Sequence, residues 1–358
     1  MMVGGSGAVL HGEDGREYLD LVAGHFHCTV GHGRFEIADQ VASALAVLEG
    51  VSADGFTTPT IERCTALVAA ATPVDDCRVL PTTSGAEAFD AAVELARVAH
   101  AVRGDRGRIG VMGGVGPDDL ADAAARLTLE GATIAAIVAD PVDVTGGVHP
   151  YPPGHLAALR DLCDAHGAYL VVDEVVSGFG RLGAWSACAR DGVAPDLLVL
   201  GETLSSGYLP VGAVAVAGPV LDVLEGDEAF VLRRGTTLPG LNAIAAAVLE
   251  TVRIVVEEGL LDAVGPIAEH LGTGLHARVS SGALAACRGD GALWAFDLPE
   301  GTPSGVVRAA LLRRGVLVRP TGPSTVAVCP PLTVSAVQID TFLGALDAVL
   351  AEAGEGIT

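Results

Sequence analysis

Residues 168–202 read AYLVVDEVVSGFGRLGAWSACARDGVAPDLLVLGE, and this stretch decides the fold. Two short apolar runs, 168–172 and 197–200, have the composition of buried strands in a parallel sheet. The first run ends on Asp173 and the second leads to Glu202. Because ligands of open α/β sheets bind beyond the carboxyl ends of the strands, both acids are predicted to face a ligand-binding cleft.

A strand–helix alternation recurs along the chain. It predicts strands at 17–22, 108–112, 133–138 and 211–217, and helices at 35–48, 82–100, 118–129, 152–166 and 241–258. This pattern indicates an α/β fold with a large domain, built on a doubly wound and mostly parallel sheet, and a smaller α+β domain. We expect the large domain at 46–250 and the small domain at 251–358, with 1–45 joining the small domain.

The composition narrows the class of protein. A formal net charge of −23 at pH 7 argues against binding to nucleic acid or to an anionic membrane surface. The uncharged run 203–221 contains Gly, Pro and Ser, so strand and turn explain it better than a membrane span. Seven cysteines without regular spacing, and no signal-peptide pattern at the start, predict reduced thiols and a cytoplasmic location.

The basic residues are all of one kind. The 21 residues counted as Lys or Arg are all arginine, so the printed sequence contains no lysine. Chemistry that needs a lysine side chain is therefore excluded for this sequence.

Residues 24–32, GHFHCTVGH, place three histidines and Cys28 close together. Imidazole and thiolate are zinc ligands, but the spacing matches no common zinc pattern. A Gly-rich turn that holds His25, His27 and His32 for packing explains the stretch as well. We therefore predict no metal site here.

The predicted helix at 82–100 opens with a capping signal. Ser84 and Glu87 have the spacing of a capping box, which marks a helix start. The free backbone N–H groups and the helix dipole at the same point favour an anion. The two interpretations are compatible.

Several motifs together resemble the class III (ornithine/ω-type) aminotransferases, which are fold-type I pyridoxal-phosphate enzymes. The resemblance is carried by 14–20 (DGREYLD), 31–32 (GH), 84–88 (SGAEA), 173–181 (DEVVSGFGR), 195–210, 235–237 (GTT), 319–320 (RP) and 330–332 (PPL). It covers nearly the whole chain, and the segment 173–181 is the most specific. It implies the fold of that family and a homodimer with the site at the subunit interface.

The resemblance also implies roles for single residues. Ser84, Gly85 and Ala86 match the segment that holds the cofactor phosphate, and Thr237 matches a threonine that reaches the partner subunit's phosphate. Asp173 matches the acid that pairs with the pyridinium nitrogen. Further matches are His25 and His27 with positions lining the substrate, Arg319 with an arginine of the diaminopelargonate branch, and Ala327 with the position of the carboxylate-binding arginine of the ornithine branch.

The chain departs from the family pattern at three places. The family's Schiff-base lysine falls on Glu202, and a carboxylate cannot take its role. The long loop whose aromatic side chain stacks on the cofactor is reduced to 113–117 (GGVGP), and Thr237 is followed by LPGL instead of an aromatic-Gly-Gly-Asn sequence. Ordinary transamination and a covalently bound pyridoxal phosphate are therefore not expected.

Without a pyridinium cation, the acids Asp140, Asp173 and Glu202 are expected to crowd one cleft and repel one another. Such repulsion raises at least one carboxyl pKa by ~1–3 units, which provides a proton donor beside an acceptor. An imidazole of His25 or His27 can relay protons near neutral pH.

These expectations favour an enzyme of a specialised biosynthetic pathway that uses general acid/base catalysis. Isomerisation, dehydration, cyclisation or condensation of a small amino- or keto-carboxylate would fit. The catalytic candidates are Glu202, Asp173, His25 and His27, and the substrate-binding candidates are Arg319, Arg234, Phe26 and Asp140.

Four alternatives remain open at this point. The protein could be a non-catalytic partner that lends Thr237 or surface to an active aminotransferase. It could hold pyridoxal or pyridoxamine phosphate without a covalent bond, through Ser84, Asp173 and Thr237. The three carboxylates could bind Mg²⁺ or Mn²⁺. Finally, Glu202 could be a structural residue that is solvated or paired with Arg234.

Overall fold

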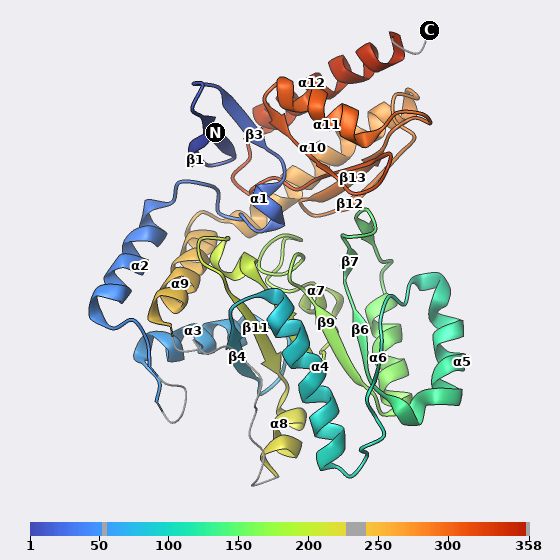
Figure 1. Ribbon diagram of the computed structural model, residues 1–358. Coiled ribbons are helices and arrows are strands. Elements are labelled where there is room, and N and C mark those ends of the chain that lie inside the picture. Colours follow the sequence, from blue (N-terminus) through green and yellow to red (C-terminus); the bar gives the residue numbers. More distant parts are fainter. Residues whose placement is uncertain (52–55, 227–240, 356–358) are drawn as a thin grey trace.

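A six-stranded sheet forms the centre of the molecule. The computed structural model describes residues 1–51, 56–226 and 241–355 (Figure 1). The strands lie in the order β4 (Arg78–Thr82), β11 (Gly212–Val216), β10 (Leu197–Leu200), β9 (Tyr169–Asp173), β6 (Ile134–Ala139) and β5 (Gly110–Met112). Strand β11 is antiparallel to both of its neighbours, whereas β10, β9, β6 and β5 pair in parallel. The predicted α/β class with a mostly parallel sheet is therefore confirmed.

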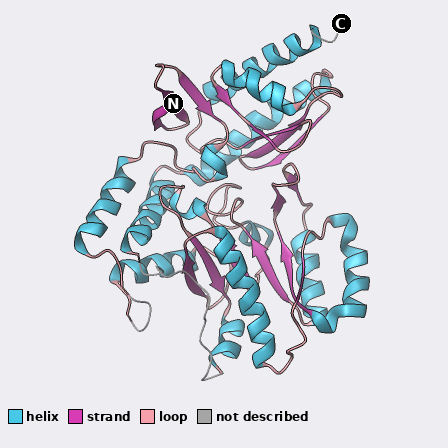
Figure 2. Cartoon of the chain, viewed as in Figure 1, coloured by secondary structure: helices cyan, strands magenta, loops and turns pink. Residues whose placement is uncertain are grey.

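The central strands are buried because helices cover them. Every residue of β6, β10 and β11 is buried. Strands that helices cover on both faces have near-continuous apolar sequences of this kind. Figure 2 shows helices flanking the strands on several sides. They are α3 (Pro59–Ala70), α4 (Gly85–Val102), α5 (Leu120–Glu130), α6 (His155–His166), α7 (Ala187–Asp191), α8 (Gly218–Glu225) and α9 (Asn242–Glu257).

The two ends of the chain share a second apolar core. Strand β3 (Glu17–Asp20) pairs in parallel with β14 (Val316–Leu317), so that the N-terminal strands lie beside the C-terminal elements (Figure 1). The other strands here are β1 (Met2–Ser6), β2 (Val9–Gly12), β12 (Ala286–Asp290), β13 (Leu293–Asp297), β15 (Arg319–Pro320) and β16 (Thr325–Val328). The helices are α2 (Phe35–Val47), α10 (Leu260–Ser280), α11 (Ser304–Arg313) and α12 (Ala336–Glu355).

Helix α9 connects the two cores. Its Val248 belongs to the core of the large sheet, and its Ile254 belongs to the core shared by the chain ends. The predicted boundary at residue 250 thus falls inside this helix, and the domain boundaries stay predictions. None of the helices in the described ranges is both long enough and apolar enough to span a membrane.

Three predicted helices begin two or three residues later in the structure than the sequence pattern indicated. The helix expected at 82–100 starts at Gly85, since Ser84 occupies its N-cap. The helix expected at 118–129 is preceded by a short 3₁₀ turn, η1 (Pro117–Asp119), and α5 starts only at Leu120. The helix expected at 152–166 starts at His155, because Gly154 has a left-handed φ of 88° and occupies the N-cap.

Candidate active site

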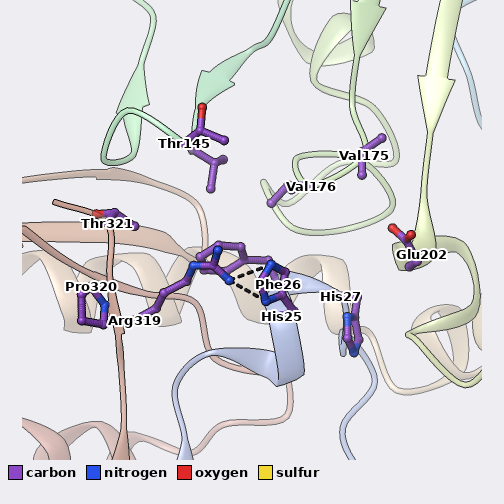
Figure 3. Close-up of a pocket in the computed structure, with 11 residues that line it drawn as sticks. His25, Phe26, His27, Thr145, Val175, Val176, Glu202, Arg319, Pro320 and Thr321 are labelled. Carbon is purple, nitrogen blue, oxygen red and sulfur yellow. Dashed lines mark hydrogen bonds between the residues drawn. The ribbon is translucent and has the colours of Figure 1, made fainter. Parts of the chain in front are cut away.

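Two adjoining cavities lie between the carboxyl ends of the sheet and the second core. We call the first, of about 400 Å³, the histidine cavity; it is lined by His25, His27, Glu202 and Arg319 (Figure 3). We call the second, of about 470 Å³, the aspartate cavity; Gly85, Ala86, Asp90, Asp140, Asp173 and Ser177 line it. Val144, Thr145, Val175 and Val176 line both. The two cavities therefore form one cleft of the size that small ligands use.

Val175 divides the predicted acid cluster. A Cβ atom on Gly85 would lie 2.7 Å from Val175 Cγ2, and one on Gly201 would lie 2.5 Å from Val175 Cγ1. Val175 is thus wedged between the start of α4 and the residue that precedes Glu202. Asp140 and Asp173 line the aspartate cavity, whereas Glu202 lines the histidine cavity. The three acids therefore line one cleft, as expected, but Val175 separates Glu202 from the two aspartates. This separation was not predicted, because strand ends fix the backbone but not the side chains packed between them.

Burial, more than repulsion, raises the pKa values of the two aspartates of the cleft. Burial raises the pKa of Asp140 to about 7, and repulsion from Asp173 and Asp143 acts in the same direction. The Asp140 side chain still faces solvent, while the cleft walls remove part of its hydration. Burial also raises the pKa of Asp173, with repulsion from Glu202 adding to it and a 2.9 Å hydrogen bond from Val175 N opposing it. Asp140 can therefore hold or release a proton near neutral pH.

Both histidines of the cleft are neutral near pH 7. Partial burial lowers the pKa of His25, and the Arg319 guanidinium lowers it further. Arg319 Nη1 lies 2.5 Å from Nδ1 and 2.7 Å from Nε2 of His25, so it donates to the nitrogen that carries no proton. Burial lowers the pKa of His27, with Glu202 opposing the shift. Figure 3 shows Arg319 against His25 and Phe26, and His27 on the side of Glu202.

His27 is held between two glycines. A Cβ atom on Gly207 would lie 2.1 Å from His27 Cδ2, and one on Gly24 would lie 2.6 Å from His27 Nε2. Gly207 follows η3 (Glu202–Ser205), the turn that begins with Glu202, and has a φ of 75°. The turn that carries Glu202 therefore packs directly on the imidazole of His27.

The loop that carries both histidines is strained and anchored. Ala23 and Phe26 have φ values of 49° and 71° in the short element α1 (Ala23–Phe26), and non-glycine residues in this region cost about 1–3 kcal/mol each. The Arg181 side chain is fully buried and donates from Nη2 to Phe26 O at 3.1 Å and from Nη1 to Pro330 O at 2.6 Å. These bonds hold the strained backbone in place.

A buried ion pair supports the start of the same loop. Asp20 is 1% exposed, and its carboxylate lies 2.8 Å from His32 Nε2 while accepting from Val22 N and Gly24 N. The Asp20 hydrogen bond raises the pKa of His32 to about 10. Burial alone would raise the pKa of Asp20, but the bonds from His32, Gly24 and Val22 outweigh it, and the net shift is downward.

We expect the His32→Asn variant to lose stability in a pH-dependent way. The folded pKa of His32 lies above the unfolded value of 6.5, so its charge stabilises the fold fully below pH 6.5 and this part is lost as pH rises through about 10. The folded pKa of Asp20 lies below the unfolded value of 3.8, so its carboxylate stabilises the fold fully above pH 3.8. This stabilisation is lost as the solution becomes more acidic. Removing the charged partner of a buried carboxylate should cost about 3 kcal/mol between pH 5 and 6.

Urea denaturation of both proteins at several pH values measures this difference. The matched control is His11→Asn, because His11 pairs with Glu17 on the surface, where the two side chains are 41% and 73% exposed. Its effect should stay below about 1 kcal/mol at every pH. A His32 effect that does not shrink from pH 6 to pH 10 would contradict the assignment of the ion pair.

The predicted phosphate segment begins helix α4. Ser84 Oγ accepts from Glu87 N at 3.1 Å, as the capping box predicts. The return bond differs, because Glu87 Oε2 accepts from Thr83 N at 2.8 Å and from the Thr83 hydroxyl instead of from Ser84 N. Gly85 and Ala86 line the aspartate cavity with Asp173. Thr237 and Arg234, the other predicted contacts, lie outside the described residues.

Phe26 and the possible metal site are the remaining predictions for the cleft. Phe26 lines the histidine cavity, and its ring centroid lies 5.0 Å from Arg319 Cζ. Within the described ranges there is no group of three or more His, Cys, Asp or Glu residues that could hold a metal ion. The alternative of a magnesium or manganese site gains no support there. The homodimer, the cytoplasmic location and the catalytic roles stay predictions.

Sequence reasoning missed the residues that support the loop and line the wall. In the sequence Arg181 is only the last residue of a motif, and its bond partners Phe26 and Pro330 are far away in the chain. Thr145 lines both cavities. In the sequence it was only a polar residue in the turn after the predicted strand 133–138, and nothing else indicated a role at the site.

Comparison with known proteins identifies the family. The Aminotransferase class-III family profile matches residues 1–113 and 118–350, and the interval between the two matches lies in the segment 113–117 (GGVGP). The chain is 32% identical over 381 residues to the acetylornithine aminotransferase of Streptomyces coelicolor, covering 99% of this chain and 92% of that protein. It is 31% identical over 373 residues to the acetylornithine aminotransferase of Mycobacterium tuberculosis, covering 98% of this chain and 91% of that protein.

Solved structures agree with this assignment. An amine transaminase from an uncultivated Pseudomonas species, in its pyridoxal-phosphate-bound internal aldimine form, superimposes with a TM-score of 0.91 at 27% identity, over 98% of this chain and 94% of that one. A transaminase from the marine bacterium Virgibacillus superimposes with a TM-score of 0.92 at 25% identity, over 100% of this chain and 94% of that one. The chain therefore belongs to the class III aminotransferase family and has the fold-type I architecture.

Proposed function

We propose that this family member does not transaminate, and that it uses general acid/base catalysis on a small amino- or keto-carboxylate. The reaction would be an isomerisation, dehydration, cyclisation or condensation in a specialised biosynthetic pathway. One observation carries the proposal. Two neutral imidazoles and Glu202 share a cavity with Arg319, beside an aspartate with a pKa of about 7, in a sequence without lysine.

The cleft fits the family cofactor only in part. The start of α4 at Gly85 and Ala86 would suit a phosphate, and Asp173 would suit a ring nitrogen. Asp90 lines the same cavity, however, and its negative charge, together with that of Asp140 when ionised, opposes a dianionic phosphate. No lysine exists to bond the aldehyde, and Glu202 takes the position that matches the family's lysine. The residues therefore do not fit covalently bound pyridoxal phosphate, and the proposed reaction uses none.

The proposed roles follow from the protonation states. A carboxylate of the substrate binds the guanidinium of Arg319, which the His25 ring and the Phe26 face hold in place. An unprotonated nitrogen of His27 accepts a proton from a carbon next to the carboxylate or the keto group of the substrate, and the electron pair of the broken C–H bond passes to the oxygen of that group as an enolate. The Glu202 carboxylate stabilises the imidazolium that results. Asp140, with its pKa of about 7, supplies a proton from the adjoining cavity.

Deuterium exchange tests this proposal before the substrate has been identified. Small amino and keto acids are incubated with the protein in D₂O, and loss of carbon-bound hydrogen is followed by proton NMR. We expect exchange in at least one compound class, and a loss of about 10²–10⁴-fold in the Glu202→Gln variant, which cannot stabilise the imidazolium.

The matched control is Glu225→Gln, since Glu225 is half exposed and pairs with Arg78 at the surface. It should exchange at the wild-type rate. Exchange that is unchanged in Glu202→Gln would place Glu202 in a structural role. A wild-type protein that exchanges nothing in the panel would instead favour a non-catalytic partner of an active aminotransferase, and co-purification with a lysine-containing homologue would support that outcome.

A further inference from the structure

We propose that a third cavity, inside the second core and outside the cleft, binds a small aliphatic carboxylate. The charged end of this ligand bonds the guanidinium of Arg308, and its hydrocarbon chain packs on the apolar walls of the cavity. The site is separate from the candidate active site, so the inference does not depend on the proposed function.

The third cavity has a volume of about 270 Å³, and we call it the Arg308 cavity. Its walls come from β2, β3, α11, β14 and β15, so both ends of the chain take part (Figure 1). Val22 and Gly24 line it, whereas His25 and His27, which follow in the same loop, line the histidine cavity. The loop therefore separates the Arg308 cavity from the cleft.

The charge of this part of the chain is opposite to that of the whole protein. Residues 301–339 contain four arginines and no Asp or Glu, in a chain with a formal net charge of −23. Arg308 and Arg319 line the cavity, and Asp20 is the only acid among the described residues that do so. The Asp20 carboxylate is 1% exposed and lies 2.8 Å from His32 Nε2, so its charge is already paired. The cavity therefore attracts an anion.

Arg308 is the cation that is available to such an anion. Its side chain is exposed, and within the described ranges it makes no hydrogen bond and no ion pair. Arg319, in contrast, donates from Nη1 to His25. A guanidinium group binds a carboxylate through two parallel hydrogen bonds and neutralises its single charge. A phosphate dianion would keep a second, uncompensated charge against apolar walls, so a carboxylate fits better.

The rest of the cavity is mostly apolar and calls for a hydrocarbon chain. Arg308 and Leu312 lie one turn apart on α11 and both line the cavity, so the guanidinium stands beside apolar surface. Water leaves such a surface when a hydrocarbon chain covers it. The ligand class is therefore a carboxylate with a short aliphatic chain and not a bare anion. The other apolar lining residues are Leu10, Val22, Val316, Leu317, Val318 and Pro320.

Equilibrium binding to three matched probes tests this inference. The probes are hexanoate, acetate, which lacks the chain, and 1-hexanol, which lacks the charge; isothermal titration calorimetry at pH 7 measures each affinity. We expect hexanoate to bind at least ~10-fold more tightly than either of the other probes, because it alone uses both the guanidinium and the apolar walls. Equal affinities for hexanoate and acetate would contradict the role of the walls.

Variants of α11 assign the two ends of the ligand. Arg308→Gln should weaken hexanoate binding at least ~10-fold and leave 1-hexanol binding unchanged, because only the charged end loses its partner. Leu312→Ala should weaken both probes by a few-fold, since both use the walls. The matched control is Arg313→Gln, which alters an exposed arginine of the same helix that does not line the cavity, and it should change neither affinity.

A crystal soaked with 6-bromohexanoate locates the bound ligand, because bromine is identified by its anomalous scattering. We expect the carboxylate at Arg308 and the bromine among the apolar walls of the Arg308 cavity. Two results would overturn the inference: bromine in the cleft alone, or hexanoate binding that is unchanged in Arg308→Gln. Because Arg308 is exposed and unpaired within the described ranges, the variant should fold as the wild type does.

Discussion

Incubation with pyridoxal phosphate followed by borohydride reduction should leave no pyridoxyl group on any side chain of this protein. Reduction fixes the cofactor only where an amine has condensed with its aldehyde, and the sequence offers no lysine amine. Glu202 presents a carboxylate in the histidine cavity, and a carboxylate cannot form that bond. We expect intact mass spectrometry to show a side-chain adduct close to zero per chain.

Two comparisons make the experiment decisive. The amine transaminase from the uncultivated Pseudomonas species, solved in its internal aldimine form, should give close to one adduct per chain under the same conditions. Peptide mapping separates any reaction at the α-amino group of Met1 from reaction at a side chain. The Glu202→Lys variant supplies an amine, but we expect weak capture, because the shortened loop 113–117 has no aromatic residue and Asp90 repels the phosphate. An adduct on a wild-type side chain would contradict the proposal.

The strands were predictable because their signal is local. The run predicted at 197–200 is β10 itself, and the run predicted at 133–138 is displaced by one residue from β6 (Ile134–Ala139). Apolar, β-branched residues that are buried on both faces leave few alternatives to a central strand. The direction of β11 was not predictable, because a strand has the same composition whichever way it runs.

The arrangement of the candidate site was only partly predictable. Motif position placed Asp173 and Glu202 at the cleft, and both line it. Their separation by Val175 depends on how one side chain fills the space beside Gly85 and Gly201, and no sequence pattern encodes that contact. The ion pair of Asp20 with His32 likewise follows from the turn between them and not from their spacing alone.

Arg181 should stabilise the loop that carries His25 and His27. We expect the Arg181→Met variant to lower the free energy of unfolding by about 2–4 kcal/mol. Two charge-assisted bonds to Phe26 O and Pro330 O are lost, and both carbonyls are left unpaired in the interior. Two effects partly offset this loss. The variant no longer buries a guanidinium group, whose Nε has no partner in the described residues. The strained Phe26 backbone can also relax.

Urea denaturation measures the change, and Arg181→Lys should fall between the wild type and Arg181→Met because an ammonium group can still donate to one carbonyl. The matched control is Arg78→Met, whose side chain is 69% exposed and paired with Glu225 at the surface, and it should cost less than about 1 kcal/mol. Because Phe26 lies between His25 and His27, the Arg181→Met variant should also slow the deuterium exchange of the proposed function, whereas Arg78→Met should not. Equal stability of the two methionine variants would show that Arg181 does not hold the loop, and the strain at Phe26 would then need another support.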